Sequence, residues 1–154
     1  MEHLNTINEC NDVVKMDERL EKLSANMPEN ETVMYIIING DLKMEKGKTA
    51  GQCCHSACRV TRVIEKLDNY TAAYKHWINN FEPKIILKAS KEELEEISKK
   101  YAIVDIKDTS KDLWCVYTRD IGRTQIERGS LTSVAFCPIF RKEVPDFIKK
   151  LKLC

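Results

Sequence analysis

The segment Thr32–Asn39, TVMYIIIN, is rich in β-branched residues, is apolar without a break over 33–38, and ends at Gly40. Such a run is typical of a strand buried on both faces of a sheet. Four further apolar runs predict strands, at 84–89, 102–106, 114–118 and 131–139, the run at 102–106 being the weakest. The apolar runs therefore predict a sheet of about four to five strands.

Helical spacing of apolar residues fills the stretches between these strands. The pattern predicts a long helix from about residue 49 to 67, a second over 70–80, and a closing amphipathic helix over 144–153. Ser90 and Glu93 have the S-x-x-E spacing of a capping box, which predicts a helix start at residue 90. Strands separated by helices predict an α/β sandwich, with a mixed sheet covered by helices on both faces.

The first 31 residues differ in composition from the rest. Eight acidic side chains against three basic ones give them a net charge of −5, and since the whole chain carries +1, the remainder carries +6. Apolar residues recur every three or four positions and predict a helix over 11–26, ended by Pro28. We therefore divide the chain into an acidic, partly helical extension (1–31) and a folded domain (32–154). The apolar stripe of the extension could cover the domain or a partner.

Composition places the chain among ordinary folded proteins. Its 154 residues are 43% hydrophobic and 32% charged, which predicts a single domain with a core of its own. No apolar run approaches the roughly 20 residues of a membrane helix, and the N-terminus lacks the basic start and apolar core of a signal peptide. We expect a cytoplasmic protein that does not enter a membrane.

Seven cysteines, an odd number, lie within apolar or helical runs and predict reduced thiols, most of them small buried side chains. Cys53, Cys54, His55 and Cys58 are close in sequence, but no second ligand pair follows at zinc-finger spacing. We expect neither a disulfide framework nor a metal site.

Polar residues of the long helix suggest chemistry. Lys48, Gln52 and His55 are spaced i, i+4 and i+7 and so share one face. The positive end of the helix dipole and the Lys48 ammonium would favour an oxyanion, and His55 could shuttle a proton near pH 7. On this interpretation other residues of the helix pack against the domain, namely Ala50, Cys54, Ala57, Cys58 and Thr61. The alternative is an ordinary solvated helix face.

A second polar segment, DIGRTQIERGSLT at 120–132, lies between two predicted strands. Gly122 and Gly129 permit sharp turns, so that the polar side chains could converge. Ligand sites of open α/β sheets favour the carboxyl ends of strands, so this segment and the helix start could face one crevice. The alternative is an ordinary polar turn.

The segments DLKMEKGKTAGQCCHSA (41–57) and DIGRTQIERGSLT (120–132) together resemble the archaeal and eukaryotic-type (type 2) peptidyl-tRNA hydrolase family. The order of elements is similar too, including KIILKA at 84–89. The resemblance covers about residues 33 to 153 and leaves the acidic extension outside. It implies hydrolysis of the ester between peptide and tRNA, which releases tRNA for further translation, without metal or organic cofactor. Members of the family are often homodimers.

The resemblance also implies site residues. The catalytic positions of the family fall on Lys48, His55, Asp120 and Thr124, and the motif positions expected to contact substrate are Asp41, Lys43, Lys46, Gln52, Arg123, Gln125 and Ser130. We expect Asp120 to orient or deprotonate water, directly or through His55, while Lys48 and Thr124 stabilise the oxyanion. Asn39 and Gly40 stand where the family has an arginine and a polar residue, and Gly51 replaces an alanine.

The phosphates of tRNA would meet basic residues around these motifs, namely Lys43, Lys46, Lys48, Arg59, Arg62, Arg123 and Arg128. Three alternatives stay open from the sequence. The fold could be an RNA- or protein-binding module that has lost catalysis, or a deacylase of another acylated tRNA. A redox or metal protein built on the cysteines is the third.

Overall fold

The computed structural model describes residues 31–67, 70–121 and 129–154. The helix predicted over 11–26 lies outside these residues. The strands are β1 (Thr32–Asn39), β2 (Lys84–Ala89), β3 (Cys115–Arg119), β4 (Leu131–Phe136), β5 (Ile139–Phe140) and β6 (Lys152–Leu153). The helices are α2 (Lys46–Ile64), α3 (Ala72–Ile78), α4 (Lys91–Tyr101) and α5 (Asp146–Lys149), and three 3-10 turns are η1 (Gly40–Leu42), η2 (Ile106–Ser110) and η3 (Arg141–Glu143).

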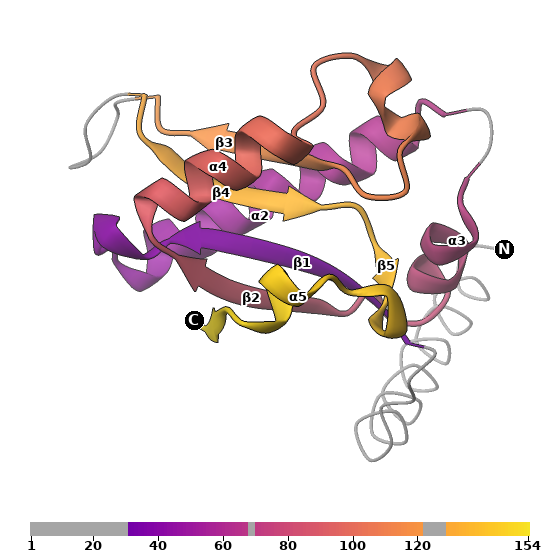
Figure 1. Cartoon of the computed structure of the whole chain (residues 1–154), viewed down its shortest axis with the longest axis horizontal. Coiled ribbons are helices and arrows are strands. Elements are labelled where there is room, and N and C mark those ends of the chain that lie inside the picture. Colours follow the sequence, from indigo (N-terminus) through magenta and orange to yellow (C-terminus); the bar gives the residue numbers. More distant parts are fainter. Residues whose placement is uncertain (1–30, 68–69, 122–128) are drawn as a thin grey trace, which may run out of the picture.

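One mixed sheet of six strands forms the centre of the domain, where four to five strands were expected (Figure 1). Its order is β3-β4-β1-β2-β6, and β5 pairs with β1 beside this path. β1 and β2 are parallel, while β4 is antiparallel to both β1 and β3. β3 therefore runs in the direction of β1, and the carboxyl ends of β1, β2 and β3 lie at one edge of the sheet.

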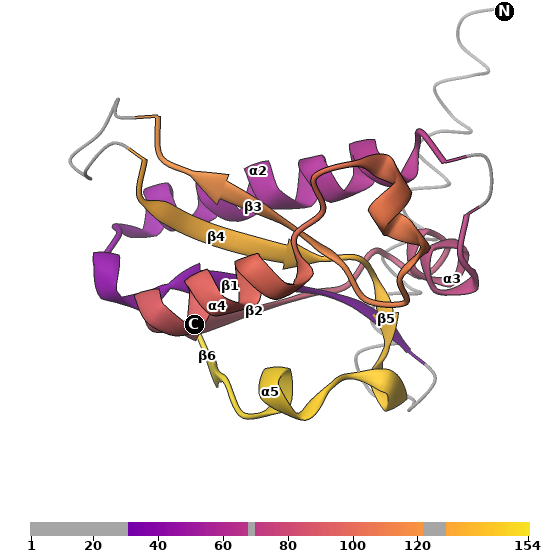
Figure 2. The ribbon, with the colours of Figure 1, turned by 45° about the horizontal axis from the view of Figure 1, so that its top comes forward.

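Helices cover both faces of this sheet (Figure 2). The Ser56 hydroxyl of α2 lies 2.6 Å from that of Ser133, and the Tyr101 ring at the end of α4 packs on Phe136, with centroids 5.6 Å apart. Ser133 and Phe136 are three positions apart on β4 and so point to opposite faces. Phe147 of α5 stacks on Tyr101 at 5.2 Å, which places α5 on the side of α4. The α/β class is confirmed.

The core is centred on β1, all eight residues of which are buried. Val60 and Ile64 of α2 close it from one side, and Leu94 and Ile97 of α4 close it from the other. The prediction of a central strand buried on both faces is thus confirmed. No helix of the described residues is both long and apolar enough to cross a membrane.

Local signals predicted several boundaries correctly. β2 has the predicted bounds, and α2 and α3 correspond to the two helices predicted after β1. The capping box at α4 is present: the Ser90 hydroxyl accepts from the Glu93 amide at 3.2 Å, and the Glu93 carboxylate accepts from the Ser90 amide at 2.9 Å.

The strand predicted over 102–106 is wrong. Ala102 makes a single bridge to Cys115, and the chain then turns into η2. The Asp108 carboxylate accepts from the backbone amides of Val104 and Asp105, both at 3.1 Å, and these bonds lower the pKa of Asp108. Such local side-chain bonds offer the backbone an alternative to a ladder of strand pairs.

Two predictions near the C-terminus are also corrected. The strand expected over 131–139 is interrupted at Pro138, which has no amide to donate to a ladder, so β4 and β5 are separate. The helix expected over 144–153 is confined to α5, a single turn. The chain then leaves the helix to form β6, because the edge of β2 offers backbone partners to Lys152 and Leu153.

Candidate active site

An ion pair joins the two polar motifs at the carboxyl edge of the sheet. Lys48 Nζ in the first turn of α2 donates to Asp120 Oδ1, just after β3, over 2.5 Å. The two side chains are 17% and 3% exposed, so the pair is largely shielded from water. Interactions between charges strengthen as water is excluded. Two segments 72 residues apart are thus brought together at a position that combines a cation with a carboxylate.

Asp120 is held in place by a tight backbone turn. Its amide donates to the Ser130 carbonyl at 2.9 Å, and its carbonyl accepts from the Gly129 amide at 2.8 Å. Gly129 has a φ of +88°, in the region that L side chains rarely adopt, so glycine is required here. The expectation that Gly129 makes a sharp turn is confirmed.

A bulge in β4 directs two neighbouring hydroxyls toward α2. The register passes from the pair Thr118–Ser133 to the pair Arg119–Leu131 and skips Thr132. Bulges of this kind redirect side chains and are common beside active sites. The Thr132 hydroxyl donates to Gln52 Oε1 at 2.6 Å and to the Thr118 carbonyl at 3.0 Å.

One turn further along α2, Ser56 continues this polar contact. Its hydroxyl lies 2.8 Å from the Thr118 hydroxyl and 2.6 Å from that of Ser133, which also donates to the Gln52 carbonyl at 3.2 Å. All of these side chains are buried, and hydrogen bonding offsets the cost of burying polar groups. We call Gln52, Ser56, Thr118, Thr132 and Ser133 the hydroxyl interface. It holds α2 against β3 and β4, with Lys48 at the level of Asp120.

The face of α2 that packs differs from the predicted one. The helix buries Gln52, Cys53, Ser56, Val60 and Ile64. The expected packing residues Ala50, Cys54 and Cys58 are exposed, and Ala57 and Thr61 are half-buried. Hydropathy assigns Gln and Ser to solvent, but here the hydroxyls of β3 and β4 supply partners that only the tertiary structure brings within reach.

Gln52 and His55 are therefore not neighbours on one open face. Gln52 is buried in the hydroxyl interface, whereas His55 is exposed. The seven residues from Lys48 to His55 correspond to about 10 Å along the helix axis. Arg59, one turn beyond His55, donates to the Tyr117 carbonyl of β3 at 2.7 Å. His55 thus lies between Lys48 and Arg59, on the flank of α2 that follows β3.

The cysteines divide equally between two environments. Of the six described, Cys53, Cys115 and Cys137 are buried as expected, but Cys54, Cys58 and Cys154 are exposed. Burial raises the pKa of Cys53 to about 11. Since the thiolate is the nucleophile and the metal ligand, this thiol is inert at neutral pH.

The other predicted site residues have different surroundings. The Asp41 carboxylate accepts from the Lys91 amide at 2.8 Å and so caps α4, a structural contact. Ser130 is half-buried in the turn that holds Asp120. Lys43 and Lys46 line a cavity of about 420 Å³ beside the start of α2. Arg123, Thr124 and Gln125 lie outside the described residues, as do Gly122 and Arg128.

Asn39 and Gly40, the departures from the family pattern, close the end of β1. The Asn39 amide donates to the Leu131 carbonyl at 2.9 Å, and its side-chain oxygen accepts from the Asp41 amide at 3.1 Å. A Cβ atom on Gly40 would lie 3.3 Å from the Ala89 carbonyl oxygen, a tight contact. Asn39 thereby ties β1 to the first residue of β4, next to the turn that holds Asp120.

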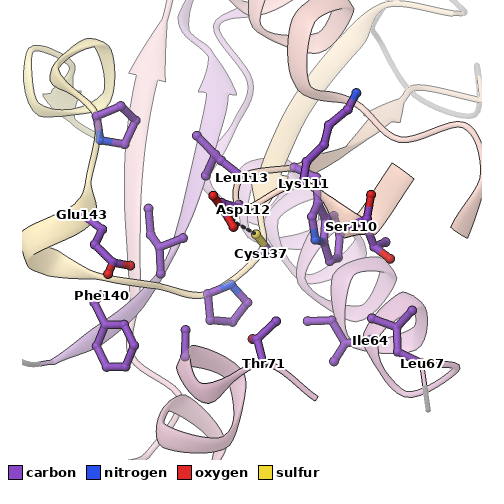
Figure 3. Close-up of a pocket in the computed structure, with 16 residues that line it drawn as sticks. Ile64, Leu67, Thr71, Ser110, Lys111, Asp112, Leu113, Cys137, Phe140 and Glu143 are labelled. Carbon is purple, nitrogen blue, oxygen red and sulfur yellow. Dashed lines mark hydrogen bonds between the residues drawn. The ribbon is translucent and has the colours of Figure 1, made fainter. Parts of the chain in front are cut away.

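Another cavity lies elsewhere (Figure 3). It measures about 610 Å³ and is lined by Ile64 and Leu67 from the end of α2, and by Cys137 and Phe140 around β5. Ile64 is 16 residues from Lys48, or about 24 Å along the helix. This cavity is therefore remote from the ion pair of Lys48 and Asp120.

Comparison with known proteins agrees with the motifs. A family model described as Peptidyl-tRNA hydrolase PTH2 matches residues 32–154. A protein of Methanococcus maripaludis named peptidyl-tRNA hydrolase is 40% identical over 119 residues, which are 77% of this chain and 95% of that protein. One of Sulfurisphaera tokodaii with the same name is 32% identical over 126 residues, or 79% and 98% of the two chains.

Proposed function

The chain belongs to the Peptidyl-tRNA hydrolase PTH2 family, and from this membership we infer that it hydrolyses the ester that joins a peptide to tRNA. The match over residues 32–154 carries this conclusion. The ion pair of Lys48 and Asp120 agrees with it, because it unites the two motifs of the resemblance. Hydrolysis releases free tRNA for translation.

We propose that Lys48 and Asp120 form the reaction centre. Ester hydrolysis requires an oriented water, stabilisation of the tetrahedral oxyanion, and protonation of the leaving ribose oxygen. The Lys48 ammonium supplies a positive charge for the oxyanion, and its position is held by Asp120 at 2.5 Å. The shielded Asp120 carboxylate also orients the attacking water. Thr124, by the resemblance, would add a second donor to the oxyanion.

We assign Gln52 and His55 different roles from those first expected. Gln52 is a positioning residue, because Thr132 already occupies its side-chain oxygen at 2.6 Å. His55 lies about 10 Å further along α2 than Lys48. We therefore assign it a contact with the incoming substrate and not proton transfer at Asp120. Asp41 contributes through the cap of α4.

We propose that Lys43 and Lys46 contact phosphates of the tRNA, in agreement with their exposure at the start of α2, the helix that carries Lys48. The cytoplasm is the compartment we propose, since translation there supplies the substrate. A homodimer stays a prediction, and light scattering coupled to size-exclusion chromatography measures it directly.

The experiment is release of an N-blocked aminoacyl group from tRNA in the presence of EDTA. Lys48→Ala and Asp120→Ala should each lower kcat/KM by about a hundredfold or more, the typical value of one acid-base or oxyanion contact. His55→Ala should have a smaller effect. Lys99→Ala, at an exposed position of α4, is the matched control and should retain wild-type activity.

Other outcomes favour the alternatives. A folded wild-type protein that binds tRNA without turnover would indicate a binding module. Turnover of unblocked aminoacyl-tRNA alone would indicate a different deacylase. Loss of activity in EDTA would contradict a metal-independent mechanism.

A further inference from the structure

Two lysines face each other on the last strands of the sheet. Lys88 of β2 and Lys152 of β6 are direct partners in the antiparallel register, so their side chains point to the same face. Both are exposed, and among the described residues neither forms an ion pair. Like charges in directly opposite positions destabilise a sheet. An anion bound between them would remove this cost.

The nearby carboxylates are engaged elsewhere. Lys88, Lys150 and Lys152 line a cavity of about 350 Å³, which Asp41 and Glu93 also line. Asp41 accepts from the Lys91 amide at 2.8 Å, and Glu93 accepts from the Ser90 amide at 2.9 Å. Both acids thus cap α4, and neither forms an ion pair with the three lysines.

This cavity adjoins the one beside the start of α2, because Gly40 and Lys88 line both. Residues at the end of β2 thus border the two cavities, while α2 packs on β3, β4 and β1. Ile38 and Ile86 give the cavity beside α2 an apolar part. We define the lysine groove as these two adjoining cavities with the five lysines that line them, Lys43, Lys46, Lys88, Lys150 and Lys152.

We propose that the lysine groove binds the phosphate backbone of the tRNA next to its aminoacylated end. This inference rests on the proposed function. Four strand spacings of about 4.8 Å separate β3 from β6, so the groove extends about 19 Å from the edge that carries Asp120. An RNA chain whose terminal ester lies at Lys48 and Asp120 therefore meets the groove within its last few nucleotides.

The phosphate backbone fits this groove better than the peptide does. The side chains of the peptide vary in charge from one substrate to the next, whereas each nucleotide carries the same negative phosphate. Five lysines around two adjoining cavities match a partner with regularly repeated negative charge, and such contacts are independent of base sequence. The groove thus extends the basic surface of the first motif, Lys43 and Lys46, by three lysines that lie outside both motifs, Lys88, Lys150 and Lys152.

The test is binding of deacylated tRNA to the full chain at about 50 to 200 mM salt, a range over which phosphate contacts weaken strongly. The variant Lys88→Gln/Lys152→Gln should bind about tenfold more weakly at the lowest salt. Its slope of log affinity against log salt should fall by about two, one for each lysine. Lys75→Gln/Lys99→Gln, which removes two exposed charges outside the groove, is the matched control and should change neither quantity.

The same variant gives a check on folding. Since it removes a pair of opposed like charges, its unfolding temperature should equal or exceed that of the wild type. Lys88→Arg/Lys152→Arg keeps the charges and should retain wild-type affinity. Weaker binding with an unchanged unfolding temperature therefore reports lost phosphate contacts.

Wild-type affinity and salt slope in Lys88→Gln/Lys152→Gln would overturn the proposal. So would normal binding of deacylated tRNA combined with weaker binding of tRNA that carries an acidic peptide, because the groove would then serve the peptide. Since the probe has no ester, binding is measured independently of hydrolysis. A wild-type protein that binds through the groove but does not release the peptide would contradict the proposed function alone.

Discussion

Ser56→Ala tests whether the hydroxyl interface stabilises the domain. The Ser56 hydroxyl is buried and lies within 2.8 Å of two other hydroxyls, those of Thr118 and Ser133. Alanine removes one polar atom and leaves the helix backbone and its volume almost unchanged. Ser133 keeps its bond to the Gln52 carbonyl, whereas Thr118 loses the partner of its hydroxyl.

The expected cost follows from these contacts. An average hydrogen bond contributes about 0.5–1.5 kcal/mol net, and a buried polar group left without a partner costs about 1–3 kcal/mol. Together they predict that Ser56→Ala lowers the free energy of unfolding by about 1.5–4.5 kcal/mol. Domains of this size lose about 2–4 °C in unfolding temperature per kcal/mol, which predicts a decrease of about 3–18 °C.

The assay is urea unfolding followed by tryptophan fluorescence, with Ser98→Ala as the matched control. Ser98 is also a buried serine in a helix, but α4 carries it on the opposite side of the sheet, outside the hydroxyl interface. Ser98→Ala should lower the free energy of unfolding by less than about 1 kcal/mol, since no interface bond is lost. If the free energies of unfolding of the two variants differ by less than about 0.5 kcal/mol, the lower limit for one average hydrogen bond, the hydroxyl interface does not stabilise the domain.

Three further predictions concern stability and thiol chemistry. Gly51→Ala should raise the free energy of unfolding by about 1 kcal/mol in the same urea assay, because a Cβ there meets nothing within 4 Å and alanine is the better helix former. Alkylation followed by mass spectrometry should modify the exposed Cys54 and Cys58 first, while Cys53, whose pKa burial raises to about 11, should react at least tenfold more slowly at pH 8; equal rates would contradict its burial. Two backbone amide donors lower the pKa of Asp108, so NMR titration of this carboxylate should give a pKa below the ordinary value of 3.8. These bonds stabilise the charged carboxylate in the folded state. The stability that they give to η2 should therefore be complete at a pH above 3.8 and be lost as the pH falls through the lowered pKa, and Asp108→Asn should abolish this pH dependence.

Local features of the fold were predictable because neighbouring residues decide them. The apolar run of β1 and the capping box of Ser90 and Glu93 act within a few positions of the chain, and the structure contains both. The turn at Gly129 likewise follows from a requirement for positive φ that glycine meets. The motifs around Lys48 and Asp120 predicted the family, which the match over 32–154 confirms.

The sequence by itself did not predict the contacts between distant segments. The predicted helix over 144–153 failed because the edge of β2 recruits Lys152 and Leu153 as a strand, a partner that no local pattern reveals. Gln52, predicted on a polar face shared with Lys48 and His55, is instead buried, because a bulge at Thr132 directs a hydroxyl at it.

The candidate site also depends on contacts between distant segments, whereas its motifs can be recognised in the sequence. The sequence by itself determined which residues carry charge, where β1, β2 and α4 begin, and that the two polar motifs of the family occur together in one chain. Only the tertiary structure decided that Lys48 meets Asp120 across 72 residues, and that Lys88 lies opposite Lys152. Burial and electrostatic strength depend on which groups exclude water from one another, and packing of distant segments sets that.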